Sequence, residues 1–185
     1  ICNEKIFPFH PMLWVNLIMD TFGALALATE KPNDSMLKRK PYGRNESIIT
    51  QSMIQNIAVQ AIFQIIVLTI VIFYGDIIFG VASDRNLTHF EWNEVNGYHF
   101  TLFFNIFVFL QVFNSFNSRK LNIEEKNVFE GVFENYLYIL IQIIIIVSQI
   151  LMVTFGGIAL RTQRLSLFQH VICIIIASFS LIVCF

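Results

Sequence analysis

Five long apolar stretches constrain the fold of this chain more than any other feature. Each is about 20 residues long, which is the length at which an α-helix crosses the hydrocarbon core of a bilayer. Of the 185 residues, 56% are hydrophobic and only 14% are charged, whereas a soluble domain is about 25% charged. The pattern predicts an all-α fold, a multi-pass transmembrane helical bundle with five spans at residues 7–28, 54–74, 98–118, 136–155 and 167–185.

The loops between these stretches differ in their content of lysine and arginine. Residues 29–53 and 119–135 hold five and three basic side chains, whereas residues 75–97 and 156–166 hold one and two. Lysine and arginine are enriched in cytosolic loops, so the ratio of eight to three places the first and third loops in the cytosol. We therefore expect residues 29–53 to form a basic cytosolic loop, and the start of the chain to lie on the outer side.

One carboxylate lies deep in the first stretch. Asp20 is near the middle of residues 7–28, where a charged side chain costs about 2.5–3.5 kcal/mol on insertion scales. Asn16 precedes it by four residues, so on a helix the two side chains share a face one turn apart. Calcium takes only oxygen ligands, which makes Asn16 and Asp20 candidate metal ligands. The alternative is a buried aspartate that hydrogen-bonds to a neighbouring helix.

These two residues do not complete a calcium site. Calcium needs about six to eight oxygens, and the pair offers roughly three at most. Gly23 stands three residues after Asp20, and it could let the helix unwind so that backbone carbonyls join the site. Close helix packing is the commoner use of glycine in a membrane.

Other polar side chains in the stretches are predicted to pack rather than to bind ions. Gln60 and Gln64 share a helix face, and we expect them to bond to a neighbouring helix because an amide is a weaker cation ligand than a carboxylate. His170 lies near the start of the last stretch and is expected at the surface. Cys173 and Cys184 have no metal-ligand spacing and are expected to pack in apolar surroundings.

Several blocks of sequence share one resemblance. The first stretch contains LWVNLIMDT followed by LALATE, and KRKPYGRN, QVFN and NVFEGVF occur further on, at residues 13–21, 25–30, 38–45, 111–114 and 127–133. These blocks resemble the sixth helix, the cytosolic segment after it, the eighth helix and the following loop of P-type calcium-transporting ATPases of the plasma-membrane type. They span most of residues 12–133, and beyond them only hydropathy agrees.

The resemblance implies that this chain holds the sixth to tenth transmembrane helices of an ATP-driven pump that exports Ca2+ from the cytosol. It would act as an enzyme only as part of that P-type ATPase, because the sequence contains no DKTG-type phosphorylation motif. Ca2+ would be the transported ion, while ATP and Mg2+ would be used by domains absent from this chain. No catalytic or cofactor-binding residue is assigned here, and only Asn16 and Asp20 carry over as ion ligands. The remaining ligands would come from the fourth helix.

Two positions depart from the two-ion reticular calcium pumps that belong to the same superfamily. Met19 stands where those pumps have a threonine ligand, and a thioether is a poor ligand for calcium. Gln111 stands where they have a glutamate. Both changes remove oxygen donors or charge, as expected for a pump that carries one ion. Gln111 fits a helix-packing amide equally well.

The expected partners follow from the same resemblance. They are Ca2+, the lipid bilayer, the N-terminal part of the same pump with helices one to five and the cytosolic domains, and calmodulin through a tail absent from this chain; no nucleic acid is expected. The membrane would be the plasma membrane or an intracellular storage or vacuolar membrane. Two alternatives remain, a non-enzymatic membrane scaffold or regulator derived from such a pump, and a P-type pump for another cation.

Overall fold

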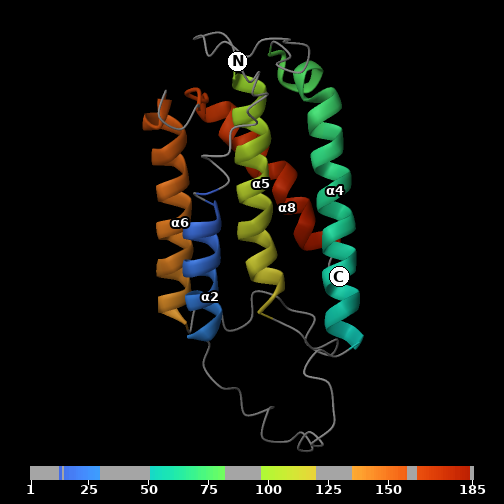
Figure 1. Ribbon diagram of the computed structural model, residues 1–185, viewed down its shortest axis with the longest axis vertical. Coiled ribbons are helices and arrows are strands. Elements are labelled where there is room, and N and C mark those ends of the chain that lie inside the picture. Colours follow the sequence, from blue (N-terminus) through green and yellow to red (C-terminus); the bar gives the residue numbers. More distant parts are fainter. Residues whose placement is uncertain are drawn as a thin grey trace, which may run out of the picture.

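The structure is a computed structural model that describes residue 13 and residues 15–29, 51–81, 97–119, 135–157 and 162–183. In these ranges the chain is helical and has no strand, so the predicted all-α class is confirmed. The elements are the π-helix η1 and the α-helices α2, α4, α5, α6 and α8, at Asn16–Asp20, Thr21–Ala28, Gln51–Phe79, Tyr98–Asn117, Tyr136–Phe155 and Leu167–Val183. Figure 1 shows α4, α5 and α6 along the long axis, with α8 running obliquely past α5.

Three helices in the described part of the chain are long and apolar enough to cross a membrane. They are Met53–Phe79 within α4, and the whole of α5 and α6. The segments Leu17–Ala28 and Leu167–Val183 are shorter apolar helices. Helix α4 has 29 residues, which correspond to about 43 Å at 1.5 Å per residue. It is therefore longer than the hydrocarbon core of a bilayer, in which a helix of this length would tilt or extend beyond the core.

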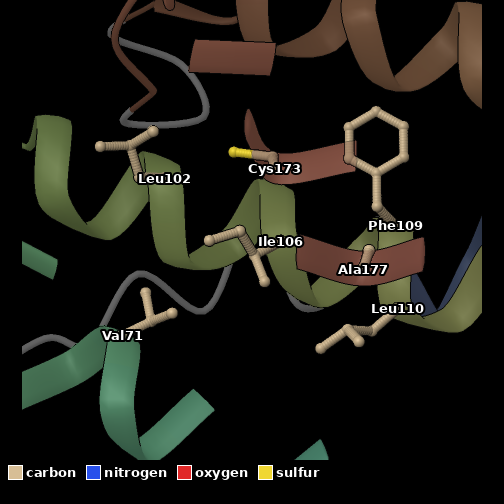
Figure 2. Close-up of a cluster of buried hydrophobic side chains, with 7 residues drawn as sticks. All are labelled: Val71, Leu102, Ile106, Phe109, Leu110, Cys173 and Ala177. Carbon is tan, nitrogen blue, oxygen red and sulfur yellow. The ribbon is translucent and has the colours of Figure 1, made fainter. Parts of the chain in front are cut away.

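Helix α5 forms the centre of the bundle. Leu102, Ile106 and Leu110 on α5 are fully buried and pack against Val71 of α4 and Cys173 of α8. Figure 2 shows how the side chains of this cluster converge from the three helices. Cys173 is fully buried in this apolar cluster, which agrees with its predicted packing role. Cys184, for which the same role was predicted, lies outside the described residues.

Helix α4 presents a different surface. Its side chains Ile57, Ile65 and Ile77 are more than half exposed, and little of this helix is buried within the bundle. A helix that is apolar all round belongs in a protein core or a membrane. These exposed apolar side chains are therefore consistent with a helix that faces lipid or further transmembrane helices.

Buried polar side chains pair with one another between helices. The amide of Gln60 donates to the hydroxyl of Ser180 at 3.0 Å, which confirms that Gln60 bonds to a neighbouring helix. His170 was expected at the surface, but this prediction is wrong, since the side chain is 6% exposed. Its Nδ1 atom lies 3.1 Å from the amide nitrogen of Asn105 on α5. An amide partner removes much of the cost of burying the imidazole among apolar helices.

Candidate ion site

The two predicted ligand positions form the ends of a stretch of unusual helix. Asn16 begins and Asp20 ends the π-helix η1, and the regular helix α2 starts at the next residue, Thr21. The backbone N–H of Thr21 donates to the carbonyl of Ile18, three residues back. The hydrogen-bond register therefore changes within one turn. Single π-helical turns are rare and are frequently found at functional sites.

A change of register has a chemical consequence for the backbone. It leaves carbonyl oxygen without the partner that a regular α-helix would provide. Such backbone is tolerated at membrane depth only where it is buried in protein or lines a polar cavity. Carbonyl oxygens are also among the ligands that calcium takes. The π-helix η1 can thus present backbone oxygen next to the two ligand positions.

One side of η1 is packed against the bundle. Val15, directly before η1, is 6% exposed and clusters with Phe104 and Val108 of α5 and Met152 of α6. Met19 is partly buried and packs against the same cluster. Its thioether therefore fills apolar space between helices, which agrees with the expectation that Met19 is not a calcium ligand.

The opposite side of this helix is open. Leu13 is 72% exposed and Leu17 is 63% exposed, and Thr21 is exposed as well. These three positions recur every four residues and so lie along one face. At helical spacing, positions 16 and 20 fall between this open face and the packed face of Val15 and Met19. The side chains of Asn16 and Asp20 lie outside the described part of the structure, so their role as ligands stays a prediction.

Gly23 does not lie in the irregular turn. That turn ends at Asp20, and Gly23 lies within the regular helix α2. A Cβ added at Gly23 would meet no described atom within 4 Å, so Gly23 makes no close helix contact with the described residues. The unwinding that the sequence placed near Gly23 instead occurs before it, in η1.

Gln111 has a partner on another helix. Its amide nitrogen donates to the side-chain oxygen of Gln64 on α4 at 3.1 Å, in a partly buried position. This bond confirms that Gln64 pairs with a neighbouring helix. It also favours the interpretation of Gln111 as a helix-packing amide over a role in a second ion site.

The described residues offer no other metal site. Within the ranges given above, no group of three His, Cys, Asp or Glu side chains lies close enough to hold a metal ion. Sequence reasoning missed the π-helix, because the residues Leu17, Ile18 and Met19 inside it are ordinary apolar residues of a membrane helix. An ion site at η1 would need further ligands from outside the described residues, in line with the prediction that Asn16 and Asp20 form only part of a shell.

Fold and site together define a class of protein. The chain is a multi-pass helical membrane domain whose first helix changes from π-helical to α-helical at the one acidic residue placed well inside a predicted span. Single π-helical turns are frequently found at functional sites. Fold and site thus define a multi-pass helical membrane domain with a candidate functional site on its first helix.

Comparison with known proteins makes this class specific. The family described as "Cation transporting ATPase, C-terminus" matches residues 7–185, and the chain belongs to this family. The chain is 43% identical over 171 residues, 92% of its length, to the plasma membrane calcium-transporting ATPase mca-1 of Caenorhabditis elegans. It is 44% identical over 165 residues, 89% of the chain, to plasma membrane calcium-transporting ATPase 4 of Bos taurus. With plasma membrane calcium-transporting ATPase 1 of Gallus gallus it shares 45% identity over 159 residues, 85% of the chain.

The matched region is a small part of these relatives. It spans 13% of the length of each of the three proteins. The resemblance to the C-terminal membrane region of plasma-membrane calcium pumps is nevertheless confirmed over most of the chain.

Proposed function

We propose that this chain is the C-terminal membrane part of an ATP-driven pump that exports Ca2+ from the cytosol across the plasma membrane. Asn16 and Asp20 supply ion ligands from its first helix. The observation that carries this proposal is the π-helix η1, which begins and ends at these two residues. The identity of the chain to plasma membrane calcium-transporting ATPases supports calcium as the ion.

The chemistry of η1 suits a hard divalent cation. A carboxylate provides charge, an amide provides a neutral oxygen, and an irregular backbone provides carbonyl oxygen, which are the three ligand types that calcium uses. These ligands are fewer than the roughly six to eight oxygens of a full calcium coordination shell. We propose that the missing ligands come from the N-terminal part of the same pump, against the open face marked by Leu13 and Leu17.

The same arrangement supports one ion per transport cycle. Met19 packs into the apolar core, and Gln111 is bonded to Gln64, so neither position offers charge to a second ion. ATP and Mg2+ would act through the cytosolic domains of the complete pump, and calmodulin would act through a tail beyond this chain. Two calcium ions at this depth would carry four positive charges, and this region offers one carboxylate to offset them. Burying the unbalanced charge would have a large desolvation cost.

The test is Asp20→Asn in the full-length protein. The amide keeps the shape of the side chain but removes its charge, and we expect loss of calcium-dependent phosphoenzyme formation with normal expression. Asp76→Asn is the matched control, because it makes the same change near the C-terminal end of α4, where the Asp76 carboxylate accepts from the N–H of Ile77. An active Asp20→Asn pump would contradict the proposal, and a wild-type protein that lacks calcium-dependent phosphorylation would favour a scaffold or regulator.

A further inference from the structure

One side chain joins the ends of two helices that are far apart in the sequence. The amide nitrogen of Asn135 donates to the backbone carbonyl of Thr29 at 3.2 Å, across 106 positions of sequence. The side-chain oxygen of the same residue accepts from the backbone N–H of Tyr138 at 3.2 Å. Asn135 is 6% exposed. Thr29 is the turn that ends α2, and Asn135 is the N-cap of α6.

Both bonds satisfy groups that a helix end leaves unpaired. The last four carbonyls and the first four N–H groups of a helix lack intrahelical partners. Asn135 covers one of each kind, because an asparagine side chain carries an acceptor and a donor. Aspartate or serine also caps the start of a helix well, but an ionised aspartate has no donor for the carbonyl of Thr29. The residue type is therefore matched to the double contact.

The α6 side of this contact is firmly held. Tyr138 is fully buried, and its hydroxyl lies 3.2 Å from the hydroxyl of Ser115 on α5. The ring packs edge-on against Phe116 with centroids 5.4 Å apart, and the guanidinium of Arg119 lies 4.7 Å from the ring centroid. The start of α6 is thus fixed to the central helix of the bundle.

The α2 side leads directly to the ion site. Helix α2 continues from η1 without a break at Asp20 and Thr21. Thr29 follows Asp20 by nine residues, or about 14 Å along a helix. Ala26 is fully buried in the cluster that contains Tyr138 and anchors the same end of α2. A change in the position of Thr29 therefore moves the backbone that carries Asp20.

We propose that Asn135 is a positioning residue for calcium binding. Its amide holds the end of the ion-binding helix against α6 and so sets the place of Asp20 relative to the rest of the bundle. The inference rests on the proposed function of this region. Asn135 would thus affect calcium affinity through the position of Asp20 and not by contact with the ion.

The pair Asn135→Asp and Asn135→Ala separates this role from simple capping. Aspartate keeps the acceptor that caps α6 and removes the donor to Thr29, whereas alanine removes both. A neutral hydrogen bond contributes roughly 0.5–1.5 kcal/mol, so in the full-length protein we expect both variants to raise the half-activating calcium concentration about two- to tenfold. Maximal phosphoenzyme per folded molecule stays unchanged. Both variants lower the unfolding temperature in detergent, because both lose the bond to Thr29.

The matched control is Ser148→Ala on α6. Its hydroxyl donates to the carbonyl of Ile145 within the same helix, so its loss leaves calcium activation unchanged. The inference is overturned if Asn135→Asp activates at the wild-type calcium concentration, whether or not Asn135→Ala is shifted, because the effect would then belong to the α6 cap. A wild-type protein with no calcium-dependent phosphoenzyme would instead refute the proposed function, and this inference with it.

Discussion

The hydrogen-bonded side chains buried between α5, α6 and α8 give a direct test of what holds the bundle together. Asn105 is fully buried, its side-chain oxygen accepts from the amide of Gln149 at 3.3 Å, and its amide nitrogen lies 3.1 Å from Nδ1 of His170. Asn105→Leu keeps the number and branching of the side-chain heavy atoms and removes both bonds. It also leaves an amide and an imidazole without their partner in an apolar interior.

The expected loss follows from these two bonds. Hydrogen bonds between membrane helices contribute about 0.6 kcal/mol on average and about 1.7 kcal/mol at most. We therefore expect Asn105→Leu to lower the free energy of unfolding by about 1–3 kcal/mol. Replacing all three residues, with Asn105→Leu, Gln149→Leu and His170→Met together, should recover at least half of this loss, because no member of the chain is then left unpaired.

Reversible unfolding in mixed micelles, followed by tryptophan fluorescence or circular dichroism, measures these changes. An Asn105→Leu variant as stable as wild type would refute the view that the hydrogen bonds among Asn105, Gln149 and His170 stabilise the bundle. A triple variant whose loss equals the sum of the three single losses would also refute it, since the side chains would then act independently.

Two further predictions concern helix contacts and orientation. Gly75→Ala places a Cβ 3.0 Å from Nε2 of His99, whose ring bonds to the carbonyl of Val71 at 2.9 Å. In a His99→Ala background we expect this substitution to stabilise the protein by about 1 kcal/mol, the usual gain of alanine over glycine in a helix, whereas in the wild type the gain is lost to crowding. Equal effects in both backgrounds would argue against crowding. Lys40→Cys should resist a membrane-impermeant thiol reagent in intact cells, because the basic loop is predicted to be cytosolic. Labelling of this cysteine from outside would contradict the predicted topology.

The helices could be predicted from the sequence because hydropathy alone is informative at membrane depth. A helix is the structure that satisfies its own backbone in lipid, so an apolar stretch of sufficient length indicates one. The ends were less accessible. Helix α4 runs from Gln51 to Phe79, beyond the predicted span of 54–74, because helical hydrogen bonding continues through polar residues such as Gln51 and Asp76 that hydropathy excludes.

The site was predictable only in part. The carboxylate of Asp20 and its spacing from Asn16 are visible in the sequence, but the π-helix between them is not, because Leu17, Ile18 and Met19 are ordinary residues of an apolar helix. The burial of His170 depends on Asn105, which is 65 positions away. The role of Asn135 depends on a carbonyl 106 positions away, and no local pattern marks a contact of that kind.

The central claim is that this region contributes one charged ligand, Asp20, to a single calcium ion. The most direct test is the number of calcium ions transported per ATP hydrolysed by the full-length protein in sealed vesicles. With one carboxylate at the site and Gln111 engaged by Gln64, the cost of burying unbalanced charge limits the expected ratio to about one. A ratio near two would contradict the single-ion site and the role assigned to Asp20 within it.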